Sequence, residues 1–256
     1  MMKAAFFDVD GTFYSHKMHG VPESHIKVLA ELKKNGIKTF LATGRHFEEL
    51  KDLSMQDIEF DGYVMLTGQI CTDKCKNLIF GNAILQEDAQ ILFDAFEKKE
   101  LPMMMVEKDF FYVNMQSEII VNGQAAISSP VPPLGNYKGA PIYQMVVYGG
   151  KELEEELRQK LPNCKIARWC QYGFDVISKT GGKVIGIQKM LEHYGIRQEE
   201  VIAFGDGEND MEMLEFAGIG VAMGNAEDEV KAAADYVTAD IDDDGIWKAC
   251  KHFGLI

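Results

Sequence analysis

Two carboxylates stand two residues apart at the end of a short apolar run. Asp8 and Asp10 follow Ala4-Ala-Phe-Phe7 and precede Gly11-Thr12. Because residues i and i+2 of a strand point to the same face, we expect the two carboxylates to lie close together at the strand's end. Two like charges this close are tolerated if a cation neutralises them or if one of them holds a proton. Either arrangement is useful in catalysis, so this segment predicts half of an active site.

Polar residues also follow other predicted strands. They are Thr43-Gly44-Arg45 after Ile37–Ala42, Thr67-Gly68 after Gly62–Leu66, and Asp206, Asn209 and Asp210 after Val201–Phe204. In parallel sheets ligands bind at the carboxyl ends of the strands, so these groups can converge. A single aspartate there is usually a helix cap or a turn former, but four such carboxylates would repel one another. A divalent cation removes the repulsion, and carboxylates with a phosphate oxygen suit Mg²⁺.

The strands that carry these residues alternate with helices in the first and last thirds of the chain. That alternation predicts an α/β core with a parallel sheet covered by helices on both faces. The middle differs, because hairpin-like strands there mix with helices and a proline-rich connection at residues 130–133. We therefore expect a core made of residues 1–81 and 182–256, with an α+β domain, residues 82–181, inserted into it.

Composition excludes several classes of protein. The chain has 256 residues, 46% hydrophobic and 26% charged, with a net charge of −14. That charge argues against nucleic acid and against an anionic membrane as partners. There is no apolar run of about 18 residues to span a membrane, and we find no secretory signal. Five cysteines at scattered spacings fit a reducing compartment, so we expect a cytoplasmic protein.

The polar segments, taken in order, resemble the four motifs of the haloacid dehalogenase-like (HAD) hydrolases. Phe6–Thr12 resembles the first motif, Thr43-Gly44-Arg45 the second, Lys183 the third and Gly205–Asp210 the fourth. The insertion lies between the second and third motifs, as in members with a type 2 (C2B) cap. Residues 211–214 and 221–226 are similar to those of the Cof-type phosphatases. The resemblance implies a Rossmann-like core with an inserted cap that sets substrate specificity.

The resemblance also implies catalytic roles. Asp8 would be the nucleophile that forms an aspartyl-phosphate. Asp10 would be the general acid and then the base, which requires it to hold a proton part of the time, as a carboxylate crowded by another can. Thr43 would hold phosphoryl oxygens, and Lys183 would neutralise charge between the nucleophile and the phosphate.

Binding roles follow for the remaining motif residues. Gly44 would hold phosphate through its N–H, and Arg45 would either reach the substrate or form a surface pair. Asn209 would support the phosphate or the metal. The Mg²⁺ ligands would be Asp8, the Asp10 carbonyl and Asp206, with Asp210 as a further ligand or a support behind them.

We therefore expect a Mg²⁺-dependent phosphatase for a small phosphorylated metabolite such as a sugar phosphate, as a monomer or weak homodimer. A phosphotransferase or mutase on the same fold differs only in the phosphoryl acceptor. A phospho-aspartate switch of the receiver type and a metal-binding protein without turnover are alternatives of another class. Receivers are about half this length and carry no inserted domain.

Some residues have no assigned role at this stage. His16 and His19 follow the first motif in what we expect to be a solvated loop. Trp169, Tyr172 and Asp175 belong to the last predicted hairpin of the cap and are candidates for specificity. Thr67-Gly68 stands where Cof-type members usually have Asn-Gly.

Overall fold

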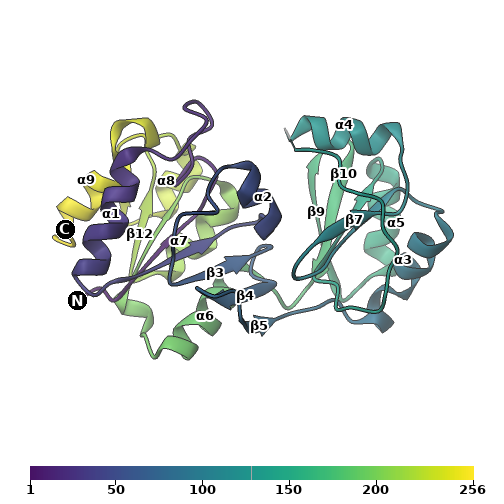
Figure 1. Cartoon of the computed structure of the whole chain (residues 1–256), viewed down its shortest axis with the longest axis horizontal. Helices are drawn as coiled ribbons and strands as arrows, with labels where there is room; N and C mark the ends of the chain where they lie inside the picture. Colours follow the sequence, from purple (N-terminus) through teal and green to yellow (C-terminus); the bar gives the residue numbers. More distant parts are fainter. Residues whose placement is uncertain (128) are drawn as a thin grey trace. The chain divides into compact units, whose positions relative to one another are not determined.

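The computed structural model describes residues 1–127 and 129–256 (Figure 1). The chain forms two compact units. Unit 1 contains Met1–Phe80 and Gly182–Ile256, and unit 2 contains Gly81–Gly181. The chain therefore leaves unit 1 once and returns to it once.

An eight-stranded sheet forms the centre of unit 1, in the order β13-β12-β11-β1-β2-β3-β4-β5. The strands are β1 (Ala4–Phe7), β2 (Lys38–Ala42), β3 (Gly62–Met65), β4 (Ile70–Asp73), β5 (Leu78–Gly81), β11 (Val201–Gly205), β12 (Ile219–Ala222) and β13 (Tyr236–Val237). The pairs from β13 through β3 are parallel, and β4 is antiparallel to β3. The predicted parallel α/β core is confirmed, with an antiparallel strand added at one side.

Helices cover both faces of this sheet (Figure 1). They are α1 (Glu23–Lys34), α2 (Phe47–Asp52), α6 (Lys183–Tyr194), α7 (Met211–Phe216), α8 (Asp228–Ala233) and α9 (Gly245–His252). Apolar residues of α6, α7 and α8 share one core with Phe6 and Phe40. Phe7 points the other way and stacks on Phe204, and Phe13 joins it to His25 of α1. Alternation along β1 thus builds a core on each face.

Strand register brings the motif residues to one edge of the sheet. Phe7 is level with Leu41 of β2 and with Phe204 of β11. All three strands run in the same direction, so the residues that follow each of them leave the sheet at the same edge.

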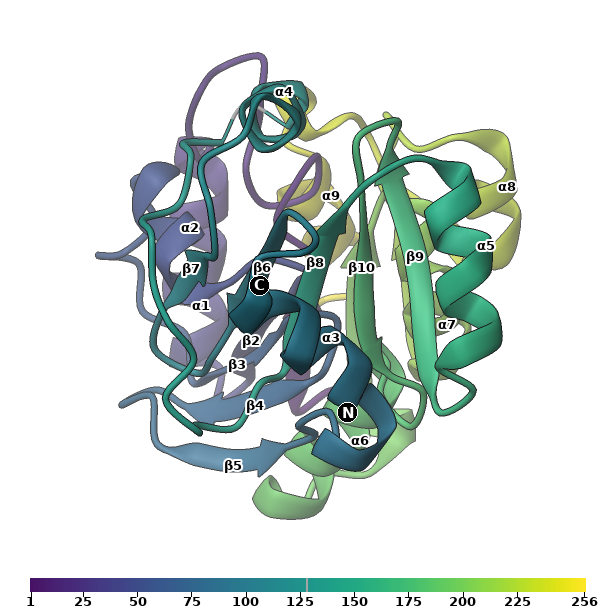
Figure 2. The ribbon, with the colours of Figure 1, turned by 90° about the vertical axis from the view of Figure 1, so that its right-hand side faces the viewer.

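Unit 2 contains a five-stranded antiparallel sheet in the order β7-β6-β8-β10-β9. Its strands are β6 (Met103–Val106), β7 (Phe111–Val113), β8 (Gln144–Tyr148), β9 (Cys164–Cys170) and β10 (Gly173–Ser178), and its helices are α3 (Gln86–Lys98), α4 (Glu118–Ala126) and α5 (Lys151–Lys160). Helices α3 and α5 cover one face over a core that includes Phe93, Leu157 and Phe174 (Figure 2). A smaller cluster joins Ile120 of α4 to Tyr148.

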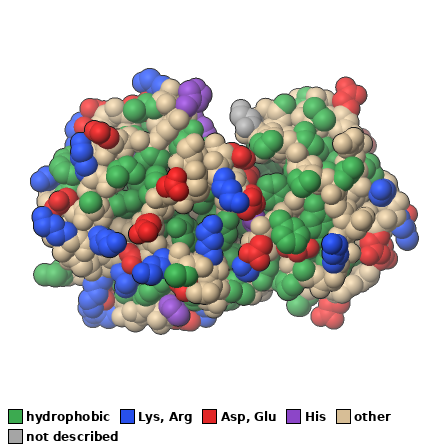
Figure 3. All heavy atoms as spheres, in the orientation of Figure 1, with side chains coloured by type: hydrophobic (Ala, Val, Ile, Leu, Met, Phe, Trp, Pro, Cys, Tyr) green, Lys and Arg blue, Asp and Glu red, His purple; other side chains and the backbone are tan. Residues whose placement is uncertain are grey.

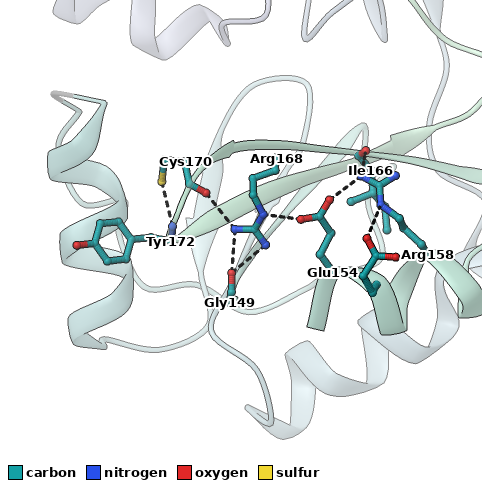
Figure 4. Close-up of polar contacts among 8 residues, drawn as sticks. Gly149, Glu154, Arg158, Ile166, Arg168, Cys170 and Tyr172 are labelled. Carbon is teal, nitrogen blue, oxygen red and sulfur yellow. Dashed lines mark hydrogen bonds and ion pairs between the residues drawn. The ribbon is translucent and has the colours of Figure 1, made fainter. Parts of the chain in front are cut away.

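A cluster of ion pairs ties α5 to β9 in unit 2 (Figure 4). Glu154 is 7% exposed and accepts hydrogen bonds from Arg158 at 2.6 Å and from Arg168. Arg168 also donates to the carbonyls of Gly149 and Cys170. Burial alone would raise the pKa of Glu154, but the two guanidinium groups outweigh it and lower that pKa. The cluster holds the start of α5 against the end of β9.

Four elements differ from the sequence-based expectation: β4, β5, α4 and α9 were not predicted. Strands β4 and β5 have only four residues each, too few for a clear alternation. Helix α4 contains Asn122 and Gly123, which have low helix propensity. Helix α9 follows a run of aspartates that reads as a loop. Its contacts with α1 stabilise a helix that local sequence alone does not indicate.

The surface charge and the lengths of the helices agree with what the net charge and the hydropathy of the chain predict. Basic side chains lie among acidic ones on the face shown in Figure 3 and form no continuous basic surface there. Within the residues described, no helix combines the length and apolar character needed to cross a bilayer.

Candidate active site

A buried lysine lies between two carboxylates at the carboxyl edge of the unit 1 sheet. Lys183 is the first residue of α6, and its Nζ lies 2.7 Å from Asp8 Oδ1 and 2.5 Å from Asp210 Oδ1. The exposed fractions are 2% for Lys183, 5% for Asp8 and 0% for Asp210. Burial disfavours the charged lysine, but the two carboxylates more than compensate and raise its pKa. Lys183 is therefore a buried cation.

One lysine does not neutralise this cluster. Burial, together with the charge of Asp210, raises the pKa of Asp8 to about 8, against the opposing effect of Lys183. Burial likewise raises the pKa of Asp206 to about 6, although Thr12 donates a hydrogen bond to it at 2.7 Å. Without a bound cation, the positive charge of Lys183 is therefore too small to stabilise all of these carboxylates in their ionised form.

The excess negative charge and the type of donor fit a metal ion. One carboxylate oxygen from each of Asp8, Asp206 and Asp210 lies within 4.8 Å of the other two. Such oxygens are ligands for hard divalent cations. Asp210 is engaged on both sides, because Oδ1 accepts from Lys183 and Oδ2 accepts from the backbone N–H groups of Asp206 and Gly207. Asp210 therefore supports the loop and the lysine, and Asp8 and Asp206 are the better placed ligands.

Gly11 allows the first motif to approach Asp206. Its φ is +77°, and a Cβ on it would lie 2.1 Å from Asp206 Oδ2. Asn225 donates to the Gly11 carbonyl at 2.9 Å and to Asp206 Oδ2 at 3.2 Å. Asn225 and Thr12 orient Asp206, and neither was given this role from the sequence. Their position after strands that end at this edge was the available signal.

Asp10 behaves differently from the sequence-based expectation. Its carboxylate accepts two hydrogen bonds of 2.7 Å from Arg45 and lies 2.8 Å from His16 Nε2. Burial raises the pKa of Asp10, but Arg45 and His16 outweigh burial, and the net shift is downward. The expectation that crowding by Asp8 keeps a proton on Asp10 was wrong. The charge of Asp210 raises the pKa of Asp8 more than the charge of Asp10 does, and the Asp10 side chain pairs with Arg45.

The second motif lies beside these groups. Thr43 is 1% exposed, its N–H donates to the Val64 carbonyl at 2.9 Å, and its Oγ1 accepts from Arg45 N–H at 3.1 Å. Gly44 is exposed. The Arg45 side chain is 21% exposed and its guanidinium is hydrogen-bonded to Asp10, so the pair is not merely a surface pair.

Other predicted residues lie outside the buried cluster. Asn209 is exposed, with its amide oxygen beside Gly207. In unit 2, Trp169 Nε1 donates to Asp175 Oδ1 at 3.0 Å. His16, which we expected in a solvated loop, is exposed but contacts Asp10.

Comparisons with known proteins find one family along nearly the whole chain. A family model described as haloacid dehalogenase-like hydrolase matches residues 5–250. The chain is 31% identical to YkrA of Bacillus subtilis (strain 168), provisionally named a phosphatase, over 99% of this chain and 98% of YkrA. Among solved structures it is similar to the HAD subclass IIB sugar phosphatase BT4131, with a TM-score of 0.81 and 38% identity over all of both chains. It is also similar to the phosphatase BT1666 from Bacteroides thetaiotaomicron, with a TM-score of 0.87 and 32% identity over 100% of this chain and 96% of BT1666.

Proposed function

We propose, from the premise that this chain belongs to the haloacid dehalogenase-like hydrolases, that it is a Mg²⁺-dependent phosphatase acting on small sugar phosphates. The observation that carries the proposal is the buried Lys183 between Asp8 and Asp210, with Asp206 close by. The subclass IIB sugar phosphatase to which the chain is similar supports the substrate class.

The reaction assigns a covalent role to Asp8. Asp8 must first lose its proton, which a bound cation would favour by offsetting the burial and the Asp210 charge that raise its pKa. Its carboxylate oxygen then attacks phosphorus, the ester P–O bond breaks, and the leaving oxygen takes a proton from Asp10. Water then attacks the phosphorus of the aspartyl-phosphate and gives its proton to Asp10, which releases phosphate and regenerates Asp8. Because Arg45 holds Asp10 as a carboxylate, this role requires the Arg45–Asp10 pair to loosen when substrate binds.

Electrostatic groups supply most of the rate enhancement in phosphoryl transfer. Lys183 lies against the nucleophile and would meet charge that develops on the phosphoryl oxygens. Thr43 and the Gly44 N–H would hold those oxygens, and Asn209 would support them from the rim of the site. Mg²⁺, held by Asp8, Asp206 and the Asp10 carbonyl, would supply further positive charge that the acidic chain lacks.

Unit 2 is proposed to act as the cap that selects the leaving group. Its own core and its ion-pair cluster make it a separately packed body. Trp169 and Asp175 pair an aromatic ring with a carboxylate, a combination that suits polyol substrates.

Phosphate release from a panel of phosphomonoesters tests the proposal. We expect turnover of one or more sugar phosphates that requires Mg²⁺ and stops in excess chelator. Asp8→Asn should lower kcat by about 10³-fold or more, because it removes the nucleophile. Asp57→Asn, a change at an exposed aspartate, is the matched control and should leave kcat unchanged. Wild-type protein that releases phosphate from none of these esters would refute the proposal.

A further inference from the structure

The turn after β3 adopts an unfavourable backbone conformation. Leu66, Thr67 and Gly68 have φ values of 51°, 52° and 84°. Three successive residues therefore lie in the left-handed region, which residues other than Gly, Asn and Asp avoid. A β-branched residue is the least suited to it, so Thr67 is the strained member.

Contacts on both sides hold this turn in place. Leu66 N–H donates to the Arg45 carbonyl at 3.3 Å, and Thr67 N–H donates to the Thr43 carbonyl at 3.0 Å. On the other side, a Cβ on Gly68 would lie 2.0 Å from the Gly182 carbonyl oxygen, directly before Lys183. The turn therefore joins the second motif to the start of α6.

The Thr67 hydroxyl lies next to the exposed backbone of Gly44. Thr67 Oγ1 is 3.4 Å from the point where a Cβ on Gly44 would lie, and Thr67 is partly exposed. The strands β1, β2 and β3 are consecutive in the sheet and are followed by Asp8, Thr43-Gly44 and Thr67 respectively. A phosphoryl group attacked by Asp8 and held at Gly44 therefore has its far side turned toward β3. An asparagine or glycine would relieve the backbone strain but would not place a hydroxyl there.

We infer that the Thr67 hydroxyl binds a phosphoryl oxygen beside Gly44, as a further substrate-binding group of this site. The inference rests on the proposed function, because it assigns the substrate's phosphoryl group to the second motif. The strain at Thr67 persists because the contacts of Thr43, Arg45 and Gly182 fix the turn, and it serves to present the hydroxyl.

Three substitutions at Thr67 separate binding from backbone conformation. Thr67→Val keeps the β-branch and removes the hydroxyl, whereas Thr67→Ser keeps the hydroxyl. Thr67→Gly suits the left-handed conformation and has no side-chain hydrogen-bond donor. The readouts are the affinity for inorganic phosphate, measured by titration calorimetry with Mg²⁺ present, and the midpoint of thermal unfolding.

We expect Thr67→Val to weaken phosphate binding about tenfold, the loss typical of one hydrogen bond to a charged group. Thr67→Ser should bind phosphate as the wild type does. Thr67→Gly should bind phosphate as weakly as Thr67→Val although it relieves the backbone strain at this position, a combination that a merely structural role does not produce.

Unchanged phosphate affinity in Thr67→Val would overturn the inference, and so would a wild-type protein that binds no phosphate. These outcomes differ from failure of the proposed function. A protein that binds phosphate with the expected Thr67 dependence but hydrolyses no ester refutes the phosphatase and keeps the binding group. Turnover together with phosphate binding that does not depend on Thr67 keeps the phosphatase and refutes the binding group.

Discussion

Replacing Lys183 with methionine removes the cation from the buried cluster and keeps a side chain of similar length. Asp8 and Asp210 would then be buried without their shared positive partner. We expect the protein to lose stability and, since Lys183 lies against the nucleophile, to lose most of its turnover as well.

The magnitude follows from the burial of the group. Lys183 is 2% exposed and Asp210 is 0% exposed, so little water reaches the carboxylates to replace the lost partner. Breaking a buried ion pair by removing one member costs about 3–5 kcal/mol. Lys189 lies on the same helix, is 39% exposed and pairs with Glu192 at 2.8 Å. Such an exposed pair contributes about 0–1 kcal/mol, so Lys189→Met is the matched control.

The loss should depend on pH. The folded-state pKa of Asp8 is about 8, above its value of 3.8 in the unfolded chain, so the native state binds the proton more tightly. Stability from this group is therefore present at low pH and is lost as pH rises toward 8. Without Lys183 the carboxylates are harder still to ionise, so Lys183→Met should be most destabilised above pH 8.

Urea unfolding followed by circular dichroism, in chelator and in excess Mg²⁺, measures these effects. We expect Mg²⁺ to reduce the deficit, because a bound cation neutralises the same carboxylates. Adding Asp210→Asn to Lys183→Met should recover part of the lost stability, since one of the unpaired charges disappears. The reasoning fails if Lys183→Met is no less stable than Lys189→Met, or if Asp210→Asn recovers nothing.

Three further changes test other contacts of unit 1. Arg45→Gln removes the two hydrogen bonds that lower the pKa of Asp10. In a plot of kcat/KM against pH, the limb that reports Asp10 should therefore move to higher pH. A limb that does not move contradicts the pairing. Gly11→Ala places a methyl group 2.1 Å from an Asp206 oxygen, and the Mg²⁺ concentration for half-maximal activity should rise about 10–100-fold; an unchanged requirement means that Asp206 does not bind the metal. His25 is fully buried, and burial lowers its pKa, so the unfolded state binds the proton more readily than the native state does. This histidine therefore destabilises the fold as pH drops below about 6.5. Denaturation of His25→Gln between pH 7 and pH 5 should show a weaker pH dependence than the wild type, and parallel curves would show that His25 is not responsible.

Much of the core and of the site composition could be predicted from local sequence. The apolar run that ends in Asp8 and Asp10 predicts both a buried strand and its polar end, because the two features lie in neighbouring residues. The same holds for Thr43 after β2 and for Asp206 after β11. Helix propensity is weak in α4, which contains Asn122 and Gly123, so the sequence pattern did not predict this helix. Packing of Ile120 against Tyr148 stabilises it.

Strand direction and the order of the motifs are enough to bring Asp8, Thr43 and Asp206 to one edge of the sheet. Which side chains at that edge form ion pairs becomes known from the folded structure alone. Lys183 pairs with Asp8, which lies 175 residues away in the sequence. Asp10 pairs with Arg45, whereas the sequence predicted that its side chain lies against Asp8. Ion pairing and pKa depend on distances and burial, which are set by strands and helices far apart in the chain.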